Sequence, residues 1–454
     1  MDRTIKIGLV GAGMFGGDVH LRTYADLQRC GIAGQLTRIG LDHHSRDFAA
    51  VRFELAAIAT RSKESAARAV ASFQQLLSEG RVTQGPDFGK KKKSGTRVTR
   101  PSGTGRAPRM YSGDTPWLDL LRDFPDLDVL AVATPDQLHT PVILAGLNAG
   151  AHVITEKPMC LDIAEADQII KRARIQNRIV AVDMHKRYDP DHLRVRNDIR
   201  NRIGEPLYGT AYLEEPLEVS TGTFKWVEQS DPFSYVGPHW VDLIYHYYKS
   251  KPVSLTAVGQ KKRLVREGIN AYDAVQVRVD FANGMSINFH NNWITPPEFE
   301  GPVNQGHEIV GADGKVESDQ QYRGFRWWNK DGGSRTANNH FTRDVKRPDG
   351  SEAYVGYGVD SLIAGLVAIC RMKFLGESRE AVAEIYPTAE ESRITVAIIH
   401  AARIVRDLNF KYLQQGKGAP VTARFGPDGI TIVDPNRAKE GAAAVLERIY
   451  RKPV

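Results

Sequence analysis

A short segment near the start of the chain joins an apolar run to a glycine-rich turn, and this pairing restricts the fold more than any other feature. Residues 4–13 read TIKIGLVGAG, and residues 11–16 read GAGMFG, a GxGxxG pattern. The apolar run predicts a buried strand, and a helix-like stretch follows to about Cys30. After such a strand, the first glycine permits a tight turn, the second lets the backbone approach a pyrophosphate, and the third lets the helix pack on the strand. The cofactor contacts expected at this turn are Gly11, Gly13, Met14, Phe15 and Gly16.

Strand-like and helix-like segments alternate through the first part of the chain. FELAAIAT (53–60) is expected to form the second strand, and LDVLAVATP (127–135) is a continuous apolar run of the kind that is buried in parallel sheets. SKESAARAVASFQQLL (62–77) has apolar positions at helical spacing, with a serine at the expected N-cap. This alternation predicts an α/β Rossmann domain with a doubly wound parallel sheet over residues 1–185, interrupted by insertions at about 31–50 and 80–110.

The remaining chain has a different pattern. Alternating, strand-like segments gather between residues 207 and 293 with few helices between them, and helical periodicity resumes at about 358–374 and 388–408. This pattern predicts a second α+β domain over residues 186–454, built on an open, largely antiparallel sheet. We expect its C-terminal helices to pack back on the first domain.

Composition and charge restrict the class of protein. Of the 454 residues, 41% are hydrophobic and 25% are charged, which is ordinary for a globular protein. The net charge of +7 is concentrated, because residues 80–110 hold nine Lys and Arg against one Asp. No nucleic-acid-binding motif accompanies this loop, and no apolar run approaches the roughly 18 residues of a membrane helix. We therefore expect no nucleic-acid or membrane partners. The three separated cysteines form no disulfide or metal pattern, so we expect a cytoplasmic protein.

The end of the second strand bears on the choice between NAD and NADP. NAD sites usually place a carboxylate there for the ribose 2′-hydroxyl. Here the strand ends with Thr60, Arg61 and Ser62, without an acid. A guanidinium suits the 2′-phosphate of NADP, although Arg61 could equally stack on adenine and leave NAD acceptable. We expect NAD(P) as the cofactor, with NADP slightly favoured and with these three residues as contacts.

Three later motifs complete a recognisable pattern. Residues 134–139 read TPDQLH, residues 150–158 read GAHVITEKP, and residues 239–242 read HWVD. In this order, and together with the glycine turn, they resemble the Gfo/Idh/MocA oxidoreductases, which include glucose–fructose oxidoreductase and inositol dehydrogenases. The resemblance covers most of residues 4–295, and EKP is its most specific part. It implies a substrate-binding and oligomerising second domain, a homo-oligomer (dimer or tetramer), and NAD(P)-dependent hydride transfer at a secondary alcohol or ketone of a sugar, polyol or sugar derivative.

The resemblance also implies roles for individual residues. Lys157 matches the lysine that contacts the substrate oxygen and the nicotinamide ribose, and Pro158 matches a proline that is often preceded by a cis bond. Arg187, in the turn after the last Rossmann strand, is expected to contact the substrate. The remaining cofactor contacts expected from these motifs are Thr134, Pro135, His139 and Glu156.

The segment around HWVD carries the expected proton-transfer group. Oxidation of a secondary alcohol needs a base for the hydroxyl proton, and histidine has a pKa near neutrality. His239 is therefore the expected catalytic base, Lys157 is expected to stabilise the developing alkoxide, and Asp242 is expected to orient His239 and contact the substrate. The aspartate that the family usually has four residues before this histidine is replaced by Tyr235, which we expect to act as an auxiliary catalytic donor to the substrate.

Other interpretations remain open at this point. His239, Asp242 and His246 could present metal ligands on one helical face, but hydride transfer needs no metal and we expect none. A glycosidase of the same fold that recycles a tightly held NAD is one alternative function, and a non-catalytic NAD(P)- or sugar-sensing protein is another. Net cofactor reduction separates a dehydrogenase from a glycosidase, and loss of activity in Lys157→Ala separates both from a sensor.

Overall fold

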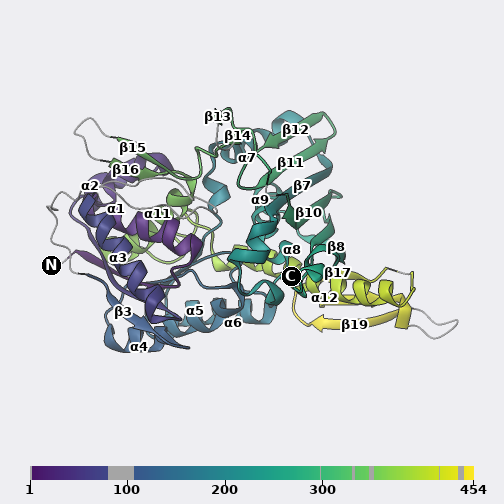
Figure 1. Ribbon diagram of the computed structural model, residues 1–454, viewed down its shortest axis with the longest axis horizontal. Coiled ribbons are helices and arrows are strands. Elements are labelled where there is room, and N and C mark those ends of the chain that lie inside the picture. Colours follow the sequence, from purple (N-terminus) through teal and green to yellow (C-terminus); the bar gives the residue numbers. More distant parts are fainter. Residues whose placement is uncertain are drawn as a thin grey trace. The chain divides into compact units, whose positions relative to one another are not determined.

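The computed structural model describes most of the chain, namely residues 3–79, 107–296, 298–329, 333–346, 352–418, 420–437 and 444–454. These residues form two compact units, each assembled from separate stretches of the sequence. Unit 1 comprises Met1–Glu156, Gln168–Asp189 and Asn339–Ala389, and unit 2 comprises Lys157–Asp167, Pro190–Asn338 and Glu390–Val454. Figure 1 shows both units and labels many of their elements. Most of the expected insertion at 80–110 lies outside the described residues.

Unit 1 contains a six-stranded sheet in which all neighbouring strands are parallel. The strand order is β3-β2-β1-β4-β5-β6, so the order reverses between β1 and β4, as in dinucleotide-binding Rossmann folds. Ligands of such sheets bind beyond the carboxyl ends of the strands near this reversal. The strands are β1 (Thr4–Val10), β2 (Arg52–Thr60), β3 (Arg109–Ser112), β4 (Val129–Val132), β5 (His152–Thr155) and β6 (Val180–Val182).

Helical segments connect these strands. The expected insertion at 31–50 folds into short helices rather than an extended loop. Expected helices and observed helices agree closely, with 62–77 matched by α3. The segments are η1 (Gly16–Leu21), α1 (Arg22–Cys30), η2 (Ala33–Ile39), η3 (Asp42–His44), α2 (Ser45–Phe48), α3 (Lys63–Glu79), α4 (Pro116–Asp123), η4 (Asp136–Leu138), α5 (His139–Asn148) and η5 (His185–Tyr188).

A segment from late in the sequence completes the core of unit 1. It contains the hairpin β15 (Arg343–Lys346) and β16 (Glu352–Val355), followed by α11 (Tyr357–Cys370) and η8 (Arg371–Leu375). Every residue of α11 is buried, as expected for a helix that is apolar on all sides. Gly365 lets α11 approach the sheet, because a Cβ there would lie 3.1 Å from the Cβ of Ala181.

Unit 2 contains a nine-stranded sheet with the order β12-β11-β7-β10-β9-β8-β17-β18-β19. All neighbouring strands are antiparallel except β7 and β10, which are parallel. Burial alternates along β9 and β10, so one face of these strands is packed and the other is more exposed. The strands are β7 (Pro206–Pro216), β8 (Pro252–Gln260), β9 (Ala274–Phe281), β10 (Ser286–Thr295), β11 (Asn304–Gly311), β12 (Gly314–Asp319), β17 (Thr422–Gly426), β18 (Gly429–Asp434) and β19 (Val445–Tyr450).

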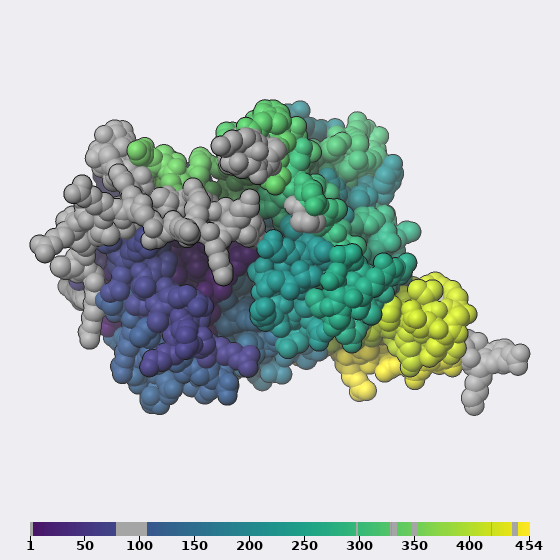
Figure 2. All heavy atoms as spheres, in the orientation of Figure 1, coloured from purple at the N-terminus to yellow at the C-terminus, as the bar shows by residue number. Residues whose placement is uncertain are grey.

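Helices pack on one side of this sheet, where α7 contacts β12 and α8 contacts β9 and β10 (Figure 1). The later part of α12 and strands β17–β19, drawn in yellow, form a lobe of this unit (Figure 2). A further hairpin, β13 (Arg326–Asn329) and β14 (Gly333–Thr336), belongs to the same unit. Two helices, α6 (Ile163–Ile175) and α12 (Ala389–Gln414), each contain a point where the chain passes between units. The other helical segments of unit 2 are α7 (Pro190–Ile203), η6 (Val219–Thr223), η7 (Val227–Gln229), α8 (Pro232–Val236), α9 (Pro238–Tyr248), α10 (Arg263–Arg266) and η9 (Pro435–Arg437).

The predicted fold class is confirmed: a Rossmann unit with a parallel sheet is combined with a unit built on a mostly antiparallel sheet. The chain changes unit at Asp189, close to the boundary expected at 185, but it also changes at four other points. Of the two C-terminal helices, α11 lies in unit 1, whereas all of α12 except Ala389 lies in unit 2. None of the helices in the described ranges has the length and apolarity needed to span a bilayer.

Candidate cofactor and substrate sites

The turn after β1 shows why glycine is required at its first and third glycine positions. Gly11 has a φ of +90°, and a Cβ added there would lie 2.2 Å from the main-chain oxygen of Ala133. A Cβ at Gly16 would lie 2.6 Å from the main-chain oxygen of Gly11. A Cβ at Gly13, in contrast, would have no atom within 4 Å. The turn is therefore closed at Gly11 and Gly16 and open at Gly13, which is the arrangement that lets a pyrophosphate reach the backbone.

The helix that follows this turn starts with an unusual winding. Met14 and Phe15 form the first helical residues, and η1 then has π-helical geometry before α1 begins. π-Helical turns are frequent at functional sites. Phe15 stacks on His185, with ring centroids 5.3 Å apart and ring planes at 14°, and its ring centroid lies 5.9 Å from that of Phe341. The backbone at Met14 and Phe15 can thus serve the expected phosphate site, while the Phe15 ring packs against other elements of unit 1.

The three residues at the tip of β2 have different environments. The Thr60 hydroxyl is mostly buried and donates a hydrogen bond to the main-chain oxygen of Ser62 at 2.8 Å. The Ser62 hydroxyl accepts a 3.1 Å hydrogen bond from the Ser65 N–H and so caps α3. Arg61 is exposed, and its main-chain oxygen accepts a hydrogen bond from the Gly113 N–H. Arg61 and Ser62 are both exposed, so a ribose or phosphate group can reach either side chain from solvent, and Arg61 is the charged one of the two.

The TPDQLH motif forms the connection between β4 and α5. His139 is the first residue of α5, is fully buried, and has its Nε2 atom 2.9 Å from the main-chain oxygen of Thr134. This hydrogen bond holds the turn that contains Thr134 and Pro135. The same turn abuts the glycine turn, because Ala133 approaches Gly11. His139 therefore acts on the expected cofactor region by fixing the backbone that follows β4.

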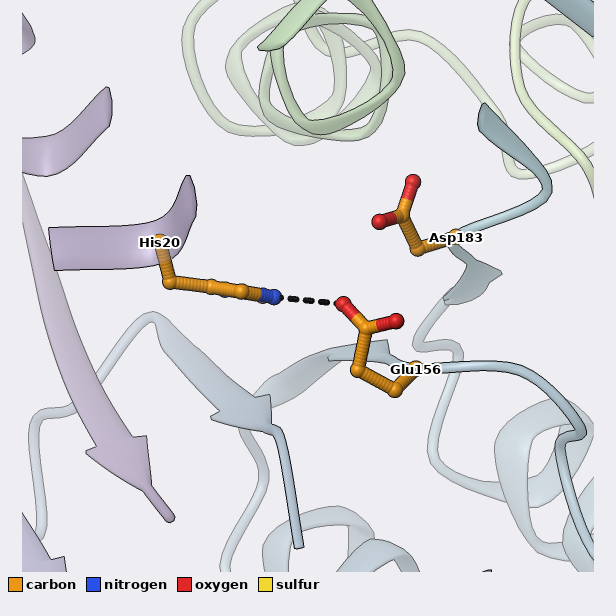
Figure 3. Close-up of side chains that lie close together, drawn as sticks. All are labelled: His20, Glu156 and Asp183. Carbon is orange, nitrogen blue, oxygen red and sulfur yellow. Dashed lines mark hydrogen bonds and ion pairs between the residues drawn. The ribbon is translucent and has the colours of Figure 1, made fainter. Parts of the chain in front are cut away.

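A buried cluster of three side chains lies beside the carboxyl ends of β5 and β6 (Figure 3). His20 comes from η1, Glu156 follows β5, and Asp183 follows β6. The Nε2 atom of His20 lies 2.8 Å from Oε1 of Glu156, and its Nδ1 atom lies 3.0 Å from the hydroxyl of Tyr24. Burial lowers the pKa of His20 to about 4, so its imidazole is neutral at physiological pH. Glu156, expected as a cofactor contact, is thus part of a polar cluster inside unit 1.

Lys157 is the next residue along the chain and belongs to unit 2. Its side chain is buried, and its ammonium donates a 2.8 Å hydrogen bond to the main-chain oxygen of Tyr235. The same ammonium lies 4.0 Å from the centroid of the Tyr235 ring, a cation–π contact. The Lys157–Pro158 peptide bond is cis, as the family resemblance implied. The structure therefore brings Lys157 and Tyr235 together, but through the carbonyl and the ring face of Tyr235.

Aromatic side chains surround Tyr235. Its ring meets Phe224 edge-on at 4.8 Å and Trp226 at 5.3 Å, and Phe224 and Trp226 stack on each other at 4.5 Å. Trp293 is fully buried and donates a 2.7 Å hydrogen bond to the buried carboxylate of Glu215. Tyr235 and Trp226 remain partly exposed. Aromatic faces of this kind can stack on the C–H faces of a sugar ring.

The expected proton-transfer helix is α9, which begins at Pro238 and leaves Tyr235 on the preceding short helix α8. His239 and Asp242 are both buried and lie one turn apart on α9. Arg187 is also buried, in η5 at the end of β6 in unit 1. Within the described ranges, three potential metal-ligand atoms come together only at His20, Glu156 and Asp183, and not on α9.

Sequence reasoning did not identify Asp183, Phe224 or Trp226. Asp183 had a usable signal, because it is an acid directly after the apolar run of β6, at the sheet edge where ligands bind. Phe224 and Trp226 lie in a segment without strong periodicity, and only the tertiary structure brings them to Tyr235. No feature of their sequence could have singled them out.

Comparison with protein families gives two matches along the chain. Residues 5–184 match the family described as "Oxidoreductase family, NAD-binding Rossmann fold". Residues 193–317 match the "GFO/IDH/MocA C-terminal domain". The first match ends just before the chain passes from unit 1 to unit 2 after Asp189, and the second covers most of the sheet of unit 2.

Curated relatives match only parts of the chain. A 1,5-anhydro-D-fructose reductase from Ensifer adhaerens is 26% identical over 202 residues, which span 42% of this chain and 57% of the reductase. A glycosyl hydrolase family 109 protein from Shewanella amazonensis is 35% identical over 127 residues, which span 26% of this chain and 28% of the relative. The chain thus aligns with little more than half, or less, of the length of these relatives.

Solved structures share the fold over most of both chains. A scyllo-inositol dehydrogenase from Lactobacillus casei, solved with NAD(H) and scyllo-inositol, has a TM-score of 0.60 at 16% identity and covers 89% of this chain and 98% of its own. GenD2 from gentamicin A biosynthesis, solved with NAD, has a TM-score of 0.61 at 15% identity and covers 93% and 97%. With both family matches in sequence order and covering more than half of the residues, the chain belongs to the Gfo/Idh/MocA oxidoreductase family.

Proposed function

We propose that this protein is an NAD(P)-dependent oxidoreductase that transfers hydride between the nicotinamide and a secondary alcohol or ketone of a sugar, polyol or sugar derivative. The observation that carries the proposal is the buried Lys157 ammonium, which is held against Tyr235 in a chain that also has an open dinucleotide turn. A buried, oriented cation is suited to stabilise an alkoxide oxygen. The named activities of the anhydrofructose reductase and the inositol dehydrogenase support a sugar or polyol as the substrate class.

Unit 1 has the residues that an NAD(P) cofactor needs. The backbone around Gly11, Gly13 and Gly16 would hold the pyrophosphate, and exposed Arg61 would hold the adenosine ribose or its 2′-phosphate. NAD(P) bound there would accept or deliver the hydride. We also propose a slight preference for NADP over NAD. Residues 60–62 at the end of β2 include no carboxylate to bind the ribose 2′-hydroxyl of NAD.

Unit 2 has the residues that handle the proton. In the oxidative direction His239 takes the hydroxyl proton, and Lys157 stabilises the negative charge that develops on the oxygen. Asp242, one turn after His239 on α9, orients the imidazole. Tyr235 holds Lys157 through its main-chain oxygen, and its hydroxyl is an auxiliary hydrogen-bond donor to the substrate. Arg187 is proposed as a further substrate contact, and a homo-oligomer is proposed as the assembly.

A second candidate function has its own support. The relative from glycosyl hydrolase family 109 is 35% identical over the aligned residues, which is the higher of the two identities given above. A hydrolase of this kind would use the same glycine turn to hold NAD through repeated turnovers and would show no net cofactor reduction.

The test is a fluorescence measurement of NADH or NADPH formation. The purified chain is mixed with near-stoichiometric NAD⁺ or NADP⁺ and a panel of free sugars, inositols and glycosides. A growing signal with one compound is the expected result, and it identifies both the substrate class and the preferred cofactor. Disappearance of a glycoside without net fluorescence supports the hydrolase instead. Absence of both, with cofactor binding intact, contradicts both enzymatic proposals for the compounds in the panel.

A further inference from the structure

The cluster of His20, Glu156 and Asp183 has the composition of a metal site. Its three side chains come from three different elements of unit 1, and their polar ends converge in one buried space (Figure 3). One imidazole nitrogen and two carboxylate oxygens are a donor set that suits divalent first-row ions such as Zn²⁺ and Mn²⁺. No thiolate is involved, which argues against a site for a soft ion such as Cu(I).

The spacing of the potential ligand atoms is close to what one ion requires. The three atoms lie within 4.8 Å of one another. An ion held at about 2.0–2.2 Å from each ligand allows ligand atoms to be separated by at most about 4.4 Å. Binding of one ion would therefore draw the ligand atoms closer together than they lie in this structure. The His20–Glu156 contact of 2.8 Å is already within this range.

Asp183 supplies a second and independent observation. Its side chain is 1% exposed, and neither carboxylate oxygen accepts a hydrogen bond of normal length within the described part of the chain. The side chains of His185 and Ser361 face this carboxylate, and Nδ1 of His185 lies 3.6 Å from Oδ2. A buried carboxylate without close donors is costly in free energy unless a cation is present.

The charges of the cluster agree with a divalent cation. Carboxylates and imidazoles bind metal ions in their deprotonated forms. Two deprotonated carboxylates and a neutral imidazole are balanced by one divalent ion.

Tyr24 fits the role of an outer partner for a metal-bound histidine. Metal-binding histidines usually donate their other ring N–H to a nearby acceptor, which fixes the ring. The Tyr24 hydroxyl lies 3.0 Å from Nδ1 of His20, on the side of the ring away from Glu156.

We propose that His20, Glu156 and Asp183 bind one divalent first-row metal ion inside unit 1. The ion ties η1, the end of β5 and the end of β6 to one another. It acts as a structural site, because Glu156 directly precedes Lys157 and a fixed Glu156 holds the start of the segment that carries this lysine. The site is distinct from the metal site considered for α9, and it does not depend on the proposed hydride transfer.

The test is direct metal binding by the full chain. Protein stripped with a chelator is titrated with ZnCl₂ by calorimetry, and metal content after dialysis is measured by mass spectrometry. One Zn²⁺ per chain is expected for the wild type. Asp183→Asn keeps the shape of the side chain and removes its charge, and it should abolish stoichiometric binding. Tyr24→Phe should weaken binding by about 10–100-fold, as loss of an outer partner does.

Matched controls make the result decisive. His152→Asn changes another buried histidine of unit 1 and should leave Zn²⁺ binding unchanged. Glu156→Gln provides a second test if Asp183→Asn does not fold, and it should also abolish binding. The proposal is overturned if neither ZnCl₂ nor MnCl₂ binds the folded wild type. It is equally overturned if Asp183→Asn and Glu156→Gln bind Zn²⁺ as the wild type does, because the ion then sits elsewhere.

Discussion

The glycine turn of unit 1 is enclosed by main-chain atoms, whereas the lysine site of unit 2 is formed mainly by side chains. At Gly11 and Gly16 the space next to the chain is closed by main-chain oxygens, which cannot move aside. At Lys157 the site consists of a lysine side chain, a tyrosine 78 positions later in the sequence, and the aromatic rings around it. A site enclosed by main-chain atoms should lose its ligand binding completely when one methyl group is added. A site formed by side chains should lose activity by different amounts, depending on which side chain is replaced.

The largest effect is expected for Gly11→Ala. The new methyl group would lie 2.2 Å from the Ala133 oxygen, at a φ of +90° that alanine rarely adopts. We expect no measurable binding of NADH or NADPH in a fluorescence titration, together with a clear loss of thermal stability. Gly34→Ala is the control, because a Cβ there would meet no atom within 4 Å, and it should behave as wild type.

Gly13→Ala tests whether the open side of the glycine turn binds the cofactor. Its methyl group has room in the cofactor-free protein, so stability should stay within about 1 kcal/mol of wild type. Cofactor affinity should still fall, because the methyl occupies the space left for the pyrophosphate. Unchanged cofactor affinity in Gly13→Ala would show that the dinucleotide does not bind at this turn.

The next largest effect concerns the helix that carries Tyr235. Asp231 caps α8 by accepting a 3.0 Å hydrogen bond from the Ser234 N–H, and it pairs with buried Arg406 at 2.5 Å. Asp231→Ala leaves Arg406 buried without this partner, so the free energy of unfolding should fall by about 3–5 kcal/mol. Urea denaturation measures this loss. Exposed Asp407 also pairs with Arg406, and Asp407→Ala should cost less than about 1 kcal/mol.

Substitutions at Lys157 and Tyr235 should show the graded response. Lys157→Met removes the cation and should lower kcat by about 100–1,000-fold, as loss of a transition-state donor does. Tyr235→Phe keeps the main-chain oxygen and the ring face that hold Lys157, so it should cost less than about tenfold. Steady-state kinetics on the substrate found in the panel measures both. A loss in Tyr235→Phe as large as that in Lys157→Met would mean that the phenol is an essential proton donor.

The smallest effect is a pH dependence in unit 1. His152 is buried at the start of β5 and accepts a 3.2 Å hydrogen bond from the Ile179 N–H. Burial, with smaller effects of Arg178 and Lys373, lowers the pKa of His152 to about 3, against about 6.5 in an unfolded chain. Between these values the unfolded chain holds a proton that the folded chain lacks, so the free energy of unfolding falls as the pH falls below 6.5.

A matched variant isolates this contribution. His152→Asn keeps an acceptor for the Ile179 N–H and removes the titrating group. Between pH 7 and pH 5 its free energy of unfolding should fall by about 2 kcal/mol less than that of the wild type. Urea denaturation at the two pH values measures the difference. Equal losses in both proteins would show that His152 is protonated in the folded state.

The glycine turn could be predicted from the sequence because all of its parts are local. The strand, the turn and the helix follow one another within residues 4–30, and each glycine has a separate physical reason. The start of α9 at Pro238 was predictable for the same reason, since a proline favours the first turn of a helix. Local chemistry therefore gave the fold class, the turn and the helix that carries His239.

Which segments of the chain make up each unit could not be predicted in this way. Arg22 pairs with Asp344, and Arg38 pairs with Asp360, each across 322 positions of the sequence. These contacts place Asn339–Ala389 in unit 1, although its periodicity shows only a helix. The aromatic surroundings of Tyr235 and the position of Asp183 beside His20 depend on similar long-range contacts.

The most direct test of the proposed hydride transfer is cofactor reduction by His239→Ala compared with wild type. Both proteins are measured with saturating NAD(P)⁺ and saturating substrate, after a titration has shown equal cofactor affinity. We expect kcat to fall by about 100-fold or more in the variant, because the base that takes the hydroxyl proton is gone. Near-normal turnover in His239→Ala would contradict this expectation, since the proton would then leave by a route that does not use α9.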